Sequence, residues 1–298
     1  MPAPTLLQPD VLNRAESLGL KARQVVEGLR VGDHKSPYRG FSVEFVQHRE
    51  YVPGDDIRHI DWKGYGRTER YTIKQYEQET NFIGHVILDG SNSMRYGEGD
   101  ANKLNYAKLL AASMSYLIVK QRDSASLRIF DEGWRTELPA SSQMGHIQTI
   151  CRELESLTSA DKTGVGPLLE EFADRVARRG LVFLISDCFE DVEPLMKGLR
   201  HVRFRGHEVV LFHVLHRDEV EFPLEGNIRF LDLEGPDQLM ARPHLLRPAY
   251  LRAMKGYLTA LEKSCEGSRI EYVRMQTDRP MSAALGAYLV RRMQYGRR

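Results

Sequence analysis

Three side chains with oxygen ligands follow an apolar stretch in the sequence HVILDGSNSM. They are Asp89, Ser91 and Ser93. Burying such groups costs free energy unless a partner satisfies them, and carboxylate and hydroxyl oxygens suit hard cations such as Mg²⁺. Three partners would account for the pattern: a metal ion, a phosphorylated substrate, or the backbone N–H groups at the start of the next helix.

The chain from residue 84 onward alternates between short apolar strands and amphipathic helices. We expect strands at 85–89, 125–130, 181–187, 208–215 and 270–276, and helices at 103–121, 145–157, 166–179, 192–204, 247–264 and 281–293. This alternation predicts an α/β fold with a doubly wound, mostly parallel sheet. Ligands bind such sheets beyond the carboxyl ends of the strands. Asp89 and Asp187 are both expected there, and Thr163 is expected in a loop before a helix.

The residues before this sheet have a different composition and spacing of apolar residues. Residues 8–30 carry apolar positions at helical spacing, and the following segment mixes charges, aromatic residues and glycine in short alternating stretches. We therefore divide the chain into a small mixed domain over 1–81 and an α/β domain over 82–298. Residues 217–246 interrupt the strand–helix rhythm, so we expect an inserted hairpin and loop there.

The composition limits the class of protein. The chain has 298 residues, of which 42% are hydrophobic and 28% charged, as in a soluble globular protein. A net charge of +1 gives no general attraction to nucleic acid. The three cysteines lack CxxC spacing, which favours reduced thiols. The sequence has neither a signal-peptide pattern nor a run of about 18 apolar residues. We expect a cytoplasmic protein without a membrane span or a nucleic-acid partner.

The order of the polar residues along the chain resembles that of a known metal-binding motif. Asp89, Ser91, Ser93, Thr163 and Asp187 occur in the order typical of the metal-ion-dependent adhesion site of von Willebrand factor type A domains. The resemblance implies that the two serines and the threonine bind Mg²⁺ or Mn²⁺ directly, while the aspartates often act through water. It also implies that an Asp or Glu from a partner protein completes the coordination. Turn and helix-cap chemistry remains the alternative for DGSNS.

A second block, REYVPGDDIRHIDW at residues 49–62, resembles the signature of the family known as domain of unknown function 58. GRTERYTIKQYEQE, LDGSNSM and the tail TDRPMSAALGAYLVRRM follow in the family's order. Because Arg and carboxylate side chains interleave in this block, we favour a structural ion-pair network or an interaction surface over a catalytic role. The residues concerned are Arg49, Tyr51, Gly54, Asp55, Asp56, Arg58, Asp61, Trp62, Arg67, Glu77 and Glu79.

The family resemblance implies a function as well as a fold. Members are von Willebrand A-like bacterial proteins often associated with MoxR-type AAA+ ATPases, and this chain is similar to the short, soluble subgroup. We expect a non-enzymatic adaptor that works with such an ATPase and with a target protein offering Asp or Glu. No residue is assigned a catalytic role, and the sequence lacks GxxxxGK[ST] and GxSxG. Two alternatives remain: a Mg²⁺-dependent phosphoryl-transfer enzyme using Asp89, and a metal-independent scaffold.

Overall fold

The computed structural model of the protein describes residues 42–52, 60–79, 83–159, 164–231 and 238–295. These residues fall into two compact units, which divide between Phe82 and Ile83. The larger unit contains the strand–helix alternation, and the smaller one contains most of the signature block. The helix predicted over residues 8–30 lies outside the described residues.

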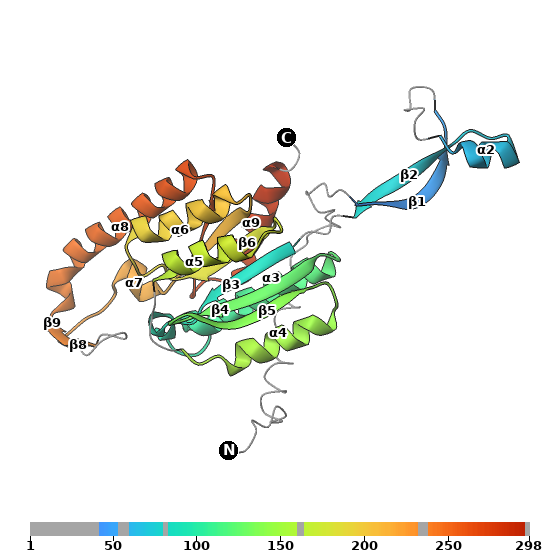
Figure 1. The fold of residues 1–298 in the computed structure, drawn as a ribbon. Coiled ribbons are helices and arrows are strands. Elements are labelled where there is room, and N and C mark those ends of the chain that lie inside the picture. Colours follow the sequence, from blue (N-terminus) through green and yellow to red (C-terminus); the bar gives the residue numbers. More distant parts are fainter. Residues whose placement is uncertain (1–41, 53–59, 80–82, 160–163, 232–237, 296–298) are drawn as a thin grey trace, which may run out of the picture. The chain divides into compact units, whose positions relative to one another are not determined.

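A six-stranded sheet forms the centre of the larger unit, with the strand order β10-β7-β6-β3-β4-β5 (Figure 1). Neighbouring strands are parallel, except that the edge strand β5 runs antiparallel to β4. The predicted α/β class with a doubly wound, mostly parallel sheet is therefore confirmed. The strands are β3 (Ile83–Asp89), β4 (Ser124–Phe130), β5 (Trp134–Ser141), β6 (Leu181–Ser186), β7 (Glu208–Leu215) and β10 (Glu271–Gln276).

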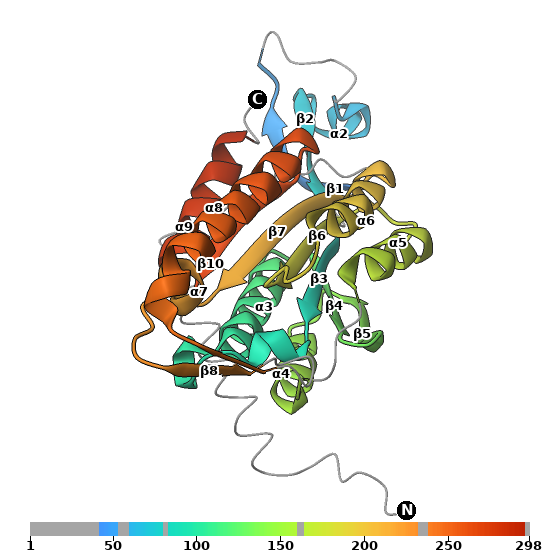
Figure 2. The same ribbon diagram turned by 90° about the vertical axis from the view of Figure 1, so that its left-hand side faces the viewer.

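Helices cover both faces of this sheet (Figure 2). On one face, α3 packs on the central strands and on α4, and α9 contacts β7 through the rings of Tyr288 and Phe212. On the other face, α5, α6 and α8 bury a single apolar cluster against the sheet. The helices are α3 (Lys103–Lys120), α4 (Gly145–Ser156), α5 (Val165–Arg175), α6 (Val192–Phe204), α8 (Pro243–Gly267) and α9 (Met281–Tyr295).

The interior strands β3, β6 and β7 are mostly apolar because both faces of the sheet are covered there. Every residue of β3 and of β6 is buried. The pair α5 and α6 approaches unusually closely, since a Cβ atom on Gly166 would lie 2.4 Å from the carbonyl oxygen of Pro194. β3 ends at Asp89 and β6 ends at Ser186, directly before Asp187, so the ends of both strands carry or adjoin residues of the predicted site.

The segment 217–246 forms a short helix and a hairpin. The helix α7 begins directly after β7, and the strands β8 and β9 pair antiparallel. Residues 232–237, between the two strands, lie outside the described part of the chain. The bounds are α7 (Arg217–Glu221), β8 (Ile228–Leu231) and β9 (Gln238–Ala241).

The smaller unit is a hairpin with one helix. Its two strands pair antiparallel with a register shift between Phe45 and Gln47. The helix follows Asp61, which is buried, and a Cβ atom on Gly64 would lie 2.7 Å from the Asp61 carboxylate. The elements are β1 (Ser42–Glu50), α2 (Trp62–Thr68) and β2 (Thr72–Glu79). Across all the residues that the structure describes, no helix is both long and apolar enough to span a membrane.

Candidate metal-binding site

The carboxylate of Asp89 lies fully buried at the carboxyl end of β3. Its Oδ1 accepts the backbone N–H of Ser91 at 2.9 Å, and its Oδ2 accepts the hydroxyl of Ser186 at 2.6 Å. Ser186 is the last residue of β6, the strand that pairs with β3. Two adjacent parallel strands therefore end at the same place and bring their polar residues together, as their position in the sheet predicts.

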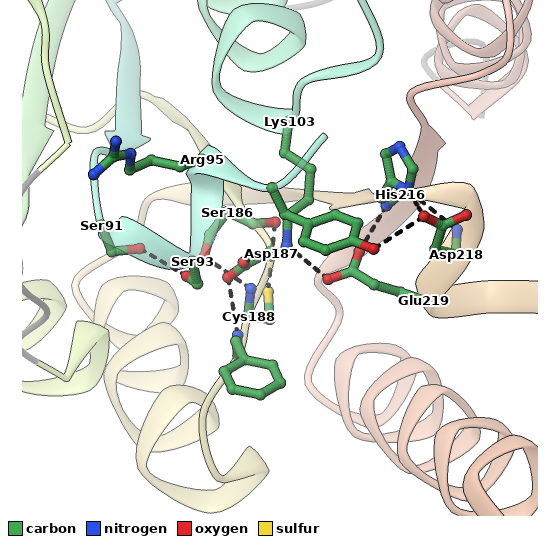
Figure 3. A network of polar contacts seen from close by, with 12 residues as sticks. Ser91, Ser93, Arg95, Lys103, Ser186, Asp187, Cys188, His216, Asp218 and Glu219 are labelled. Carbon is green, nitrogen blue, oxygen red and sulfur yellow. Dashed lines mark hydrogen bonds and ion pairs between the residues drawn. The ribbon is translucent and has the colours of Figure 1, made fainter. Parts of the chain in front are cut away.

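The two serines of the motif are also buried and point toward each other. The hydroxyl oxygens of Ser91 and Ser93 lie 3.0 Å apart (Figure 3). Ser91 precedes a 3-10 helix, Asn92–Arg95, yet its side chain caps no backbone N–H of that helix. The longer helix α3 is capped instead by Asn102, whose Oδ1 accepts the N–H of Asn105 at 3.0 Å. The Ser91 side chain is therefore not a helix cap. The bond from the Ser91 N–H to Asp89 Oδ1 is a turn contact, so turn chemistry stays the alternative for this motif.

Asp187 follows β6 and lies within the same polar cluster (Figure 3). Its Oδ1 accepts the backbone N–H of Phe189 at 3.1 Å. Its Oδ2 accepts a bond from the ammonium of Lys103 at 2.8 Å, and the same ammonium donates to Oε1 of Glu219 at 2.7 Å. The centre of the cluster thus holds a cation that belongs to the protein itself.

Lys103 is the first residue of α3 and is 1% exposed. Burial alone would lower the pKa of its ammonium, but the carboxylates of Asp187 and Glu219 raise that pKa above its ordinary value. The lysine is therefore charged at neutral pH. A cation in the first turn of a helix lies at the positive end of the helix dipole, so a basic residue there was a signal for an acidic partner that our sequence analysis did not use.

The electrostatics of Asp89 differ from those of Asp187. Burial, followed by repulsion from Asp187, raises the pKa of Asp89 to about 6, although bonds from Ser186 and Ser91 act in the opposite direction. Both of these bonds come from neutral donors. A carboxylate in such surroundings is stabilised by a nearby cation. Asp89, with the paired hydroxyls of Ser91 and Ser93, therefore provides the hard oxygen donors that Mg²⁺ or Mn²⁺ prefers.

Neutral groups hold the loop that carries Asp187. His213 of β7 shares a hydrogen bond of 2.9 Å between its Nε2 and the carbonyl oxygen of Asp187, and one of 2.7 Å between its Nδ1 and the Tyr272 hydroxyl. Burial lowers the pKa of His213 to about 4, so the ring is neutral at pH 7. Burial also raises the pKa of the Cys188 thiol well above its usual range. Cys188 is therefore unsuited to act as a nucleophile.

Several predicted site residues lie outside the described part of the chain. Thr163 is one of them, so its place relative to Asp89 stays a prediction. The structure brings Asp89, Ser91, Ser93 and Asp187 into one cluster and adds residues that the sequence analysis missed. These are Lys103, Ser186 and Glu219. Among the described residues, no three His, Cys, Asp or Glu side chains gather as metal ligands, so a metal here would depend on hydroxyl oxygens.

The signature block is described in part. Tyr51 and Tyr71 have ring centroids 6.4 Å apart, Asp61 is buried, and Trp62 is 61% exposed. The backbones of Arg49, Arg67, Glu77 and Glu79 lie on β1, α2 and β2. Gly54, Asp55, Asp56 and Arg58 lie outside the described residues. Their expected role in an ion-pair network or an interaction surface stays a prediction.

Comparison with known proteins finds chains similar to this one among curated proteins and among solved structures. "Uncharacterized protein Rv1480" of Mycobacterium tuberculosis is 25% identical over 288 residues, which span 95% of this chain and 90% of the relative. Among solved structures, the conserved hypothetical protein BatB from Bacteroides thetaiotaomicron is 19% identical with a TM-score of 0.46. The similarity covers 72% of this chain and 99% of that one. An aerotolerance-related membrane protein from Bacteroides fragilis is 18% identical with a TM-score of 0.47, over 70% and 97% of the two chains.

The family itself is shown by a model that matches residues 47–257, well over half of the chain. The match includes the signature block, the Asp89 motif, Lys103, Asp187 and Glu219. The resemblance noted from the sequence is thereby confirmed, and the chain belongs to the family described as protein of unknown function DUF58.

Proposed function

We propose that this chain is a non-enzymatic interaction protein that binds a divalent cation, Mg²⁺ or Mn²⁺, at the Asp89 cluster. The observation that carries the proposal is the fully buried Asp89 carboxylate, which accepts bonds from neutral donors and has a raised pKa. A bound cation would relieve this unfavourable burial of charge. Ser91 and Ser93 would hold the ion with neutral oxygens, and Thr163 would join them as the family resemblance implies.

A cation held mainly by neutral oxygens attracts a further carboxylate. We propose that an Asp or Glu of a partner protein supplies it, as in the adhesion sites that this motif resembles. Membership of DUF58 supports a MoxR-type AAA+ ATPase as the second partner, through the association known for the family. The complex would assemble or activate a target protein.

A phosphoryl-transfer role for Asp89 has weaker support. A nucleophilic aspartate needs access to its substrate, whereas Asp89 is fully buried and both carboxylate oxygens accept hydrogen bonds. The position two residues later, where such enzymes carry an acid–base carboxylate, is Ser91. A metal-independent scaffold is the better second candidate, because Lys103 already supplies a positive charge to Asp187.

Calorimetric titration of the purified chain with Mn²⁺ and Mg²⁺ tests the proposal. Wild type should bind one ion, and Ser93→Ala should bind it at least tenfold more weakly, because one ligand oxygen is lost. Ser115→Ala is the matched control. The Ser115 hydroxyl donates to the Ala111 carbonyl of its own helix, so its loss should leave the affinity unchanged. Equal binding by both variants, or no binding by wild type, would favour the scaffold.

Capture of the partner gives the second readout. The chain, immobilised with Mg²⁺, should retain the MoxR-type ATPase or its target protein, and EDTA should release the part of the complex that depends on the ion. If EDTA does not reduce retention of the partner by wild type or by Ser93→Ala, the interaction belongs to another surface.

A further inference from the structure

The buried ammonium of Lys103 joins the predicted metal site to α7. One of its partners, Asp187, follows β6 and belongs to the predicted metal-binding residues, while the other, Glu219, lies on α7. Figure 3 shows the ammonium between these two carboxylates. The side chains of Lys103 and Asp187 are almost completely buried, whereas that of Glu219 is 22% exposed. One carboxylate is therefore fixed in the interior, and the other lies close to solvent.

Fold stability alone is a poor reason for this arrangement. Removing an ammonium and a carboxylate from water costs several kcal/mol per ion, and apolar residues of similar volume often serve as well or better. The position is also unfavourable for a cation, because Lys103 begins α3 and lies at the positive end of its dipole. A lysine at this place is better explained by what its charge does to the site.

The charges of the cluster indicate what that effect is. Asp89, Asp187 and Glu219 carry three negative charges when ionised, and Lys103 carries one positive charge. The four side chains therefore sum to two negative charges, which a single divalent cation neutralises. Lys103 would repel that cation and compete with it for Asp187, while Glu219 offers the ammonium a second acceptor.

We propose that Lys103 is a tethered competitor for the metal, and that Glu219 sets the strength of the competition. This inference rests on the proposed metal binding and says how the metal affinity is regulated. In the structure the ammonium is shared between Asp187 and Glu219, so Glu219 weakens its hold on Asp187. When α7 moves away, the ammonium turns fully to Asp187 and the affinity for metal falls. The metal affinity thus depends on the position of α7.

The contacts of α7 support such a coupling. The second oxygen of Glu219 accepts the N–H of His216 at 2.6 Å, which fixes the carboxylate on the first turn of α7. Asp218 accepts the hydroxyl of Tyr96 at 2.9 Å, and Tyr96 comes three residues after Ser93. The hydroxyl of Tyr250 on α8 donates to the carbonyl oxygen of Glu219 at 3.0 Å. Displacement of α7 would therefore be felt at Lys103 and in the loop of the two serines.

Titration with Mn²⁺ alone, followed by calorimetry, tests the inference on paired variants. Lys103→Met should bind Mn²⁺ at least tenfold more tightly than wild type. Lys108→Met removes the same charge from the same helix, but the Lys108 ammonium bonds the carbonyl oxygen of Leu157, so the affinity should change less than threefold. Equal affinities of the two lysine variants would overturn the inference and leave the proposed metal binding intact.

A second pair of variants tests the inference even if Lys103→Met does not fold. Glu219→Gln keeps the shape of the side chain but weakens its hold on the ammonium, so Mn²⁺ binding should weaken at least fivefold. Glu221→Gln removes an equal charge from the same helix, where Glu221 pairs with Arg217 at 2.7 Å, and should weaken binding less than twofold. Equal effects of the two would contradict the inference. Mn²⁺ binding by Lys103→Met but not by wild type would support the competition by Lys103 and overturn the proposed metal binding of wild type. No binding by wild type or any variant would overturn both proposals.

Discussion

Replacement of Asp89 by Asn should make the metal-free protein more stable and insensitive to metal. The substitution keeps the size of the side chain and an oxygen that can accept the N–H of Ser91, but it removes the buried charge. A residue retained for structure would be expected to weaken the fold when changed. A residue retained for binding a cation should instead destabilise the empty site, because its charge is unfavourable until the ion arrives.

The magnitude follows from the pKa of Asp89. Burial and the Asp187 charge raise it from 3.8 to about 6, so the ionised carboxylate destabilises the folded state by about 3 kcal/mol at pH 7. The Ser186 hydroxyl loses an ionised acceptor in the variant, which offsets about 1 kcal/mol. The net gain of about 2 kcal/mol corresponds to a rise in Tm of about 4–8 °C for a unit of this size.

The pH dependence has a definite sign. Since the folded pKa of Asp89 lies above the unfolded one, the folded protein holds the proton more tightly, and the destabilisation appears only as the pH rises from 3.8 through about 6. The advantage of Asp89→Asn should therefore be full at pH 7.5 and vanish below pH 4. Mg²⁺ at a hundred times its Kd should stabilise wild type by about 2.7 kcal/mol and leave the variant unchanged.

Thermal melts followed by circular dichroism, in EDTA and in Mg²⁺ and at several pH values, provide the assay. Asp131→Asn is the matched control. Asp131 follows the neighbouring strand β4 and is also buried, but its carboxylate pairs with Arg135 at 3.1 Å, so its loss should lower the Tm. A Tm of Asp89→Asn at or below that of wild type in EDTA at pH 7.5 would refute the reasoning about the buried charge.

Three further predictions concern the framework around the site. In EDTA, Lys103→Met should lower the free energy of unfolding by about 3–5 kcal/mol, because it removes the cation from a buried ion pair. Lys108→Met should cost about 1–3 kcal/mol; urea melts compare the two, and equal losses would contradict the pairing. Gly166→Ala should lower the stability of the fold, because a Cβ atom there would clash in the close α5–α6 contact. Gly256→Ala, at an open position of α8, should stabilise the fold by up to ~1 kcal/mol. A Gly166→Ala variant as stable as wild type in the same melts would argue against that contact. Burial lowers the pKa of His85 to about 3. The free energy of unfolding of wild type should therefore fall by about 1.4 kcal/mol per pH unit below 6.5 through this group, a loss that His85→Gln should lack. Parallel pH profiles of stability for the two proteins would disprove this.

Much of the fold could be predicted because its strands are buried on both faces. The predicted strand over 208–215 matches β7, and the predicted helix over 192–204 matches α6. The edge strand β5 was not predicted, since it is partly exposed, contains Pro139 and lacks the apolar run of an interior strand. The helices α2 and α7 are too short for a helical period to be visible in the sequence.

The candidate site was predicted in part for a related reason. Asp89, Ser91, Ser93 and Asp187 follow strands, and the ends of parallel strands converge whatever the loops do. Glu219 reaches the cluster through a short helix after β7, and nothing in a linear pattern places such a helix. Lys103 was treated as part of an amphipathic helix, although its position in the first turn was informative.

The contacts that build the site join parts of the chain that are far apart in sequence. Asp89 and Ser186 are separated by 97 positions, Lys103 and Asp187 by 84, and Lys103 and Glu219 by 116. Closing such long loops is entropically unfavourable until much of the sheet has formed. We therefore expect the Lys103 pairs to form after the folding transition state, so that their loss accelerates unfolding more than it slows folding. A chain emerging from the ribosome would hold all the proposed metal-binding residues once Asp187 has been made, but it would gain the second partner of Lys103 only after Glu219 has been made.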